Sequence, residues 1–219
     1  MSALQHTTTV KVRSSSLSAD ISVHPASPER WPDISTLFAG HGERGCWCQY
    51  WRQSSSEYAK GTLGSGQRNL RRQTEEGPAP GMLAYLVGVP VGWLGFWPRE
   101  KMERLVRSRT IPKIDDVPVW AIVCFMIRTG YRRRGVAHAL LRGAIEYARS
   151  AGVPALEAYP VDAGGQRVDV SFGYVGFTSM FEAAGFRTVM ETEARSAGLP
   201  RILMRLDLCR SNGGDRVEG

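Results

Sequence analysis

Cysteine is scarce in this chain of 219 residues, which holds only Cys46, Cys48, Cys124 and Cys209. That density is far below what a small disulfide-stapled domain carries, so we expect reduced thiols and a cytoplasmic protein. The C-x-C pair at 46–48, with His41 nearby, does not match the two-to-four-residue spacing of zinc ligands, and no second pair follows it. We therefore predict no metal site.

Long apolar runs are also missing. The longest, VPVWAIVCFMI at 117–127, has about half the length that a membrane-spanning helix needs. The first twenty residues are polar and lack the apolar centre of a signal peptide. We predict no membrane association and a single domain over 20–208, preceded by a disordered leader at 1–19 and followed by a loose tail at 209–219.

Positive charge is in excess, with a formal net charge of +7 and an isoelectric point near 9.5. This balance favours an anionic partner such as a phosphate-bearing small molecule or a nucleic acid, although a basic surface can also serve solubility alone. The sequence contains no helix-turn-helix, zinc-finger or aromatic ribonucleoprotein signature, so recognition of a duplex lacks support.

Strand and helix patterns alternate along the chain. Strands are predicted at 20–25, 81–98 (two, in a hairpin around 88–90), 117–127, 153–161 and 201–208, and helices at 27–40, 65–77, 135–152 and 177–186. The segment 117–127 is apolar on both faces, which predicts a central strand. The order of elements indicates an α/β fold with one central sheet, and 187–200 carries no predicted element.

The segment YRRRGVAHALL at 131–141 places three arginines and a glycine between a central strand and an amphipathic helix. The first N–H groups of a helix lack internal partners and its dipole is positive there, so a pyrophosphate fits at this end. Gly135 lets the backbone approach closely, and the small Ala137 keeps the approach clear. At this turn, neither G-x-x-x-x-G-K-[ST] nor G-x-G-x-x-G occurs. The alternative is a solvated or nucleic-acid-binding arginine patch.

This segment resembles the R-x-x-G-x-G/A signature of the GNAT acyltransferases, with Arg132, Gly135 and Ala137 on its fixed positions. The resemblance implies a mixed, mostly antiparallel, splayed sheet flanked by helices, and acetyl-CoA as co-substrate. It places the pyrophosphate at Arg132, Arg133, Arg134, Gly135, Val136 and Ala137, and the pantetheine arm along Phe125 and Ile127. Downstream, FEAAGF resembles the family's Y-E-x-x-G-F ending, and Phe181 stands beside the coenzyme where the family often has a tyrosine.

Phe181 cannot donate a proton, so the chemistry needs other candidates. Tyr174, seven residues earlier, is a candidate acid toward the leaving thiolate, or else packs with its hydroxyl at the rim. Glu157 is the candidate base because it alternates in phase with Tyr159, and half-burial beside a cleft would raise its pKa. A solvated or ion-paired Glu157 is the alternative. Cys124 is either a covalent relay or a buried small residue.

Acceptor recognition is predicted from aromatic residues. The loop GCWCQYW supplies Trp47 and Tyr50, while Trp120 and Tyr159 lie on predicted strands. In the alternative interpretation, the aromatic rings pack the loop against the hydrophobic core. The predicted function is transfer of an acetyl group to a primary amine, of a small molecule, by direct attack in a ternary complex. A protein or aminoacyl-tRNA amine, a non-catalytic acyl-CoA-binding or sensor module, and a homodimer all stay open.

Overall fold

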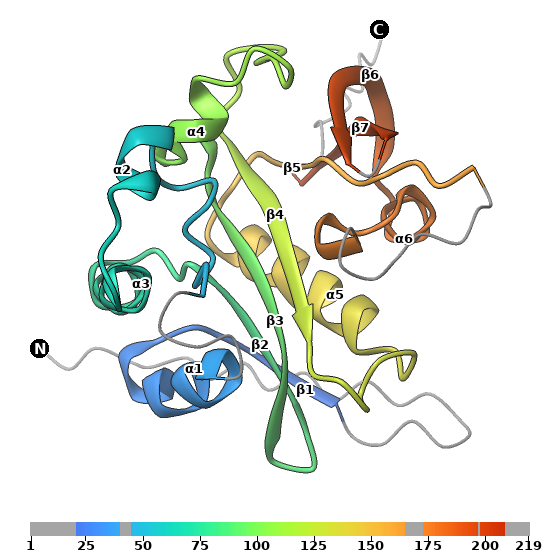
Figure 1. Cartoon of the computed structure of the whole chain (residues 1–219). Helices are drawn as coiled ribbons and strands as arrows, with labels where there is room; N and C mark the ends of the chain where they lie inside the picture. The colour runs from blue at the N-terminus through green and yellow to red at the C-terminus, as the bar shows by residue number, and fades with distance from the viewer. Residues whose placement is uncertain (1–20, 40–44, 165–172, 197, 209–219) are drawn as a thin grey trace, which may run out of the picture.

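The computed structural model describes residues 21–39, 45–164, 173–196 and 198–208. Its centre is a seven-stranded sheet in the order β1-β2-β3-β4-β5-β7-β6 (Figure 1). All neighbouring strands are antiparallel except β4 and β5, which are parallel. The strands are β1 Ile21–Pro25, β2 Gly81–Leu86, β3 Val89–Pro98, β4 Val119–Ile127, β5 Ala155–Ala158, β6 Arg187–Ser196 and β7 Leu199–Asp207. This confirms the predicted α/β class and the mixed, mostly antiparallel sheet.

Helices cover both faces of the sheet. They are α1 Trp31–Phe38, α2 Ser55–Ala59, α3 Ser65–Glu76, α4 Glu103–Val106, α5 Val136–Ser150 and α6 Thr178–Glu182, with 3-10 turns η1 Pro28–Arg30, η3 Arg99–Lys101 and η4 Gly173–Val175. The apolar stripe of α5 packs with β2, β3 and β4 in the main core on one face. On the other face, α1 and α3 bury a second cluster around Trp93, and a third cluster lies around Tyr159.

Each predicted strand and helix has a counterpart in the structure, and the main addition is a strand in the region 187–200. The strand at 117–127 is confirmed as central, since β4 is the fourth of seven strands, and the 81–98 segment forms the predicted hairpin. The strand β6 was not predicted. It is an edge strand whose side chains are mostly exposed and rich in charge, so it lacks the apolar alternation that identifies a half-buried strand.

The two central strands separate part of the way along β4. Residues Val119–Ile122 pair with Ala155–Ala158 of β5, and β4 then continues to Ile127 without this neighbour. On its other side, β4 has a bulge against β3: Gly95 pairs with Cys124 and Phe96 with Ile122, so Val123 has no partner. The bulge and the divergence together open the sheet beside the second half of β4.

The described part of the chain contains no helix that is both long and apolar enough to cross a bilayer. The predicted leader 1–19 and tail 209–219 lie outside the described residues, as do His41 and Cys209. Within the described residues, no three His, Cys, Asp or Glu side chains form a group that can hold a metal ion.

Candidate active site

The turn between β4 and α5 presents backbone N–H groups at the start of a 15-residue helix. Gly135 caps this helix with φ 80° and ψ 0°, in the left-handed region that glycine adopts without strain. Among the described residues, no side chain hydrogen-bonds to the cap, and the first turn of α5 holds no acidic residue. The helix dipole and the uncapped N–H groups therefore make this end attractive to an anion.

Three exposed arginines lie at this helix end: Arg132, Arg133 and Arg134. The Nε of Arg132 donates to the carbonyl oxygen of Ile127 at 3.3 Å, which ties the turn to the end of β4. The guanidinium of Arg134 lies 5.7 Å from the ring centroid of Tyr131. A Cβ placed on Gly135 would meet no atom within 4 Å, so the space beside the cap is open. Open space, free N–H groups and guanidinium groups fit a pyrophosphate.

The second half of β4 directs part of its backbone into the opening of the sheet. The N–H of Arg128 donates to Val91 O in β3 at 3.0 Å. Because backbone groups of successive strand residues point to opposite edges, Ile127 and Phe125 direct their N–H and C=O groups away from β3. That edge is the one that β5 leaves uncovered after Ile122. The geometry offers a ladder of hydrogen bonds to an extended, amide-containing ligand.

Phe181 of α6 lies at the base of this region and is fully buried. Its ring centroid is 6.0 Å from that of Phe125 and 5.1 Å from that of Phe186, both in edge-to-face contacts. Tyr174 is not on the same helix, because α6 begins at Thr178 and Tyr174 lies on the preceding 3-10 turn η4. Its exposed fraction is 37%, and burial of the phenol raises its pKa.

Glu157 and Tyr159 lie on the same face of the sheet, as their alternation predicts, but both are buried. Tyr159 Oη donates to Glu157 Oε2 at 2.8 Å, and the Nε of Arg99 lies 3.6 Å from the same oxygen. The Arg99 Nε also donates to Tyr159 Oη at 3.3 Å. Burial raises the pKa of Glu157, although the hydrogen bond from Tyr159 and the charge of Arg99 oppose the shift. The carboxyl group is therefore ion-paired and still raised in pKa.

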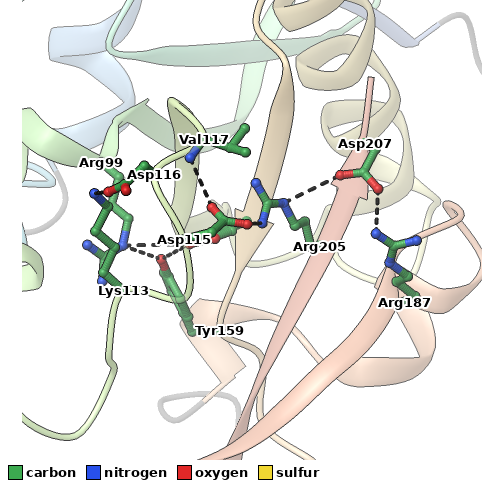
Figure 2. A network of polar contacts seen from close by, with 10 residues as sticks. Arg99, Lys113, Asp115, Asp116, Val117, Tyr159, Arg187, Arg205 and Asp207 are labelled. Carbon is green, nitrogen blue, oxygen red and sulfur yellow. Dashed lines mark hydrogen bonds and ion pairs between the residues drawn. The ribbon is translucent and has the colours of Figure 1, made fainter. Parts of the chain in front are cut away.

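Other charged side chains continue this network along β7 (Figure 2). Arg205, opposite Glu157 in the β5–β7 register, is 5% exposed and forms ion pairs with Asp115 and Asp207. Asp207 in turn pairs with Arg187 of β6 at 2.5 Å. Since Arg205 has carboxylate partners of its own, Arg99 is the cation paired with Glu157.

The family model for the acetyltransferase (GNAT) family matches residues 45–168, which is more than half of the sequence. The chain belongs to the GNAT acetyltransferase family. It is therefore an acyltransferase that uses acetyl-CoA. A search of curated proteins finds no match.

Solved structures share the GNAT fold at low sequence identity. A GNAT acetyltransferase from Streptococcus pneumoniae is 17% identical, with a TM-score of 0.51 over 87% of this chain and 100% of that one. A GCN5-related N-acetyltransferase from Kribbella flavida is 18% identical, with a TM-score of 0.51 over 86% and 98%. A ribosomal-protein-alanine N-acetyltransferase from Brucella melitensis is also 18% identical, with a TM-score of 0.51 over 85% and 99%.

The aromatic residues predicted to bind the acceptor lie in different places in this GNAT domain. Trp47 is 4% exposed and stacks on Phe38 in the core. Trp120 lies on the α5 face, 6.0 Å from the ring centroid of Tyr147, whereas Tyr159 belongs to the cluster on the opposite face. Tyr50 is 39% exposed. Of these four rings, Tyr50 is the most exposed.

One residue near Tyr50 was missed by sequence reasoning as a site residue. Arg201 of β7 is 4% exposed, donates from Nε to Tyr159 O at 2.9 Å, and lies 5.1 Å from the Trp51 ring centroid. Its buried second terminal nitrogen has no hydrogen-bond partner in the described part of the chain. Its charge lowers the pKa of Tyr174, against the larger opposing effect of burial. An arginine within the apolar strand RILMRLDL is the signal that could have identified it.

Proposed function

We propose that this GNAT protein transfers the acetyl group of acetyl-CoA to a primary amine of a small molecule by direct attack in a ternary complex. The observation that carries the proposal is the β4–turn–α5 geometry, with its open Gly135 cap, uncapped N–H groups and exposed arginines. A single catalytic domain over 20–208 is part of the proposal.

Binding is assigned to two stretches of backbone. The N–H groups at Gly135, Val136 and Ala137 would hold the pyrophosphate, with the three preceding arginines adding charge. The backbone of Phe125 and Ile127 would hold the pantetheine arm, and the ring of the buried Phe181 would pack against that of Phe125. The coenzyme supplies the activated thioester, and holding the two reactants in line provides the largest part of the rate enhancement.

Glu157 is proposed as the general base. Its raised pKa makes the carboxylate a stronger base than an ordinary glutamate. Because Glu157 is 2% exposed and its carboxylate accepts a hydrogen bond from Tyr159, we propose that the proton reaches it through a water rather than by direct contact with the amine. Of the aromatic residues predicted for the acceptor, Tyr50 is the one proposed to contact it, because Trp47 and Tyr159 are buried and Trp120 lies on the opposite face of the sheet.

Tyr174 is proposed as the general acid that protonates the leaving thiolate. We expect Tyr174→Phe to lower kcat about tenfold while acetyl-CoA binding stays within twofold, because only the hydroxyl is removed. Steady-state kinetics and calorimetry check this. Tyr131→Phe, in the turn before α5, is the matched control and should leave kcat unchanged. An unaltered kcat in Tyr174→Phe would reject the acid assignment.

The acceptor class is tested with an amine panel. The purified chain is incubated with acetyl-CoA and one acceptor at a time: a small primary amine, a peptide with a free N-terminal amine, or an aminoacyl-tRNA. Release of the CoA thiol is measured, and mass spectrometry identifies the acetylated product. We expect acetylated small amines, with thiol release and product formed in equal amounts. Acetylation of the peptide or the aminoacyl-tRNA alone would replace the small-molecule acceptor with a macromolecular one.

A further inference from the structure

Two cysteines from distant parts of the sequence meet on the face of the sheet opposite α5. Cys48 belongs to the loop between α1 and α2 and is 5% exposed, whereas Cys124 lies at the bulge of β4 and is partly exposed. Their thiols are hydrogen-bonded to each other. The proposed acetyl transfer uses neither residue.

The sheet leaves room for one of these sulfurs. Gly95 of β3 pairs with Cys124, and a Cβ placed on Gly95 would lie 2.2 Å from the Sγ of Cys48 and 3.5 Å from the Cβ of Cys124. The absence of a side chain at this position therefore seats the Cys48 thiol directly beside Cys124. The backbone that delivers it is unusual, because Trp47 and Cys48 have φ angles of 45° and 59°.

A guanidinium group lies on the same sulfur. The Arg52 side chain is buried and donates to Cys48 Sγ at 3.8 Å and to Gln73 Oε1 at 3.2 Å. None of the ion pairs between described residues involves Arg52, so no carboxylate there balances its charge. Its other partners, Gln73 Oε1, Pro80 O and the Trp97 ring, are neutral, so a Cys48 thiolate would be its anionic partner among the described residues.

The electrostatic environment shifts the pKa values of the two thiols in opposite directions. The hydrogen bond from Cys124 and the charge of Arg52 lower the pKa of Cys48 to about 6, against the opposing effect of burial. The hydrogen bond to Cys48 and burial raise the pKa of Cys124. These shifts favour a thiolate at Cys48 next to a thiol at Cys124, which is the arrangement of a reactive cysteine and its resolving partner.

We propose that Cys48 and Cys124 form an oxidisable dithiol, which hydrogen peroxide converts into a disulfide that ties the 46–52 loop to β4. The thiolate sulfur attacks one peroxide oxygen, so that an S–O bond forms, the O–O bond breaks, and hydroxide leaves and takes up a proton as water. The remaining thiol sulfur then attacks the oxidised sulfur, the S–S bond forms, and the S–O oxygen leaves as water with the thiol proton. Two thiols are oxidised and one peroxide is reduced to two waters.

Formation of the Cys48–Cys124 disulfide is tested on the full chain by measuring its intact mass and by peptide mapping without a reductant. After peroxide treatment we expect the loss of two hydrogen masses, a fall in free thiols from four to two, and a Cys48–Cys124 cross-linked peptide. Cys48→Ser and Cys124→Ser should each prevent it, whereas Cys46→Ser, which removes an exposed thiol nearby, should not. Retention of all four thiols, or a cross-link through Cys46 or Cys209, would overturn the proposal.

The rate provides a second test. Oxidation of the pair should change by less than about twofold between pH 7 and pH 9, since the thiolate is already formed. A thiol with an ordinary pKa of about 8.5 would react roughly 25-fold faster at the higher pH. A rise of that size would show that Arg52 and Cys124 do not stabilise a thiolate at Cys48.

The consequence for catalysis rests on the proposed function. The tied loop carries Tyr50 and Trp51, so oxidation should lower amine acetylation about tenfold, leave acetyl-CoA binding unchanged, and be reversed by dithiothreitol. Failure of the reduced protein to acetylate any amine would reject the proposed function, while the mass measurement would still test the disulfide. A disulfide that leaves turnover unchanged would overturn the regulatory effect.

Discussion

Gly135→Glu should weaken acetyl-CoA binding at least a hundredfold while the protein stays folded. The substitution places a carboxylate at the helix end where the pyrophosphate is expected, in space that is open in the structure. Repulsion between like charges and displacement of the phosphates from the N–H groups then act together. Calorimetric titration with acetyl-CoA and with CoA is the measurement, and thermal melting reports the fold.

The chain offers a closely matched control for this variant. Gly152 follows the C-terminal end of the same helix, has φ 69°, and is also open to solvent at its Cβ position. Gly152→Glu therefore introduces the same backbone strain and the same charge, and a carboxylate is less favourable at a helix C-terminus than at an N-terminus. It should destabilise the fold at least as much, yet bind acetyl-CoA normally. Equal loss of binding in both variants would mean that strain, not position, causes the effect.

A third variant separates charge from the loss of glycine. Gly135→Asn introduces a neutral side chain that tolerates the left-handed conformation. We expect binding within about fivefold of the parent. If Gly135→Asn loses as much affinity as Gly135→Glu, the backbone geometry of the turn matters more than the electrostatics.

Local patterns predicted the turn before α5 and the elements beside it. The signal around Gly135 is contiguous in sequence, because a buried strand, a tight turn and an amphipathic helix are each encoded within a few residues. The same-face placement of Glu157 and Tyr159 follows from strand alternation alone. These features need no knowledge of which strands pair.

Features that depend on long-range packing were not predictable in the same way. The burial of Glu157, its ion pair with Arg99, and the burial of Arg201 depend on residues that come from β5, β7 and the segments beside them. The meeting of Cys48 with Cys124 depends on a glycine in a third segment. A single sequence gives the identity of each residue but not the pairing that sets its solvation or pKa.

Glu157→Gln should lower kcat about a hundredfold and leave acetyl-CoA affinity unchanged. A glutamine has nearly the same volume and can still accept the Tyr159 hydrogen bond, but it cannot take a proton from the amine. Because a base acts as the carboxylate, and burial raises its pKa above 4.5, the parent should lose activity as the pH falls through that raised value. Glu157→Gln should lack this acidic limb. Glu191→Gln, on the exposed edge strand β6, is the control and should retain it.

Tyr159→Phe also tests the assignment of Glu157 as the base, because it removes the hydrogen-bond donor of Glu157. The hydrogen bond from Tyr159 lowers the pKa of Glu157, so its removal should raise that pKa and move the acidic limb of the activity profile to higher pH. A purely structural Tyr159 would lower stability without moving the limb. If instead the limb survives unchanged in Glu157→Gln, the titrating base is a different group, and the buried Arg99–Glu157 pair serves only to hold β5 against the turn after β3.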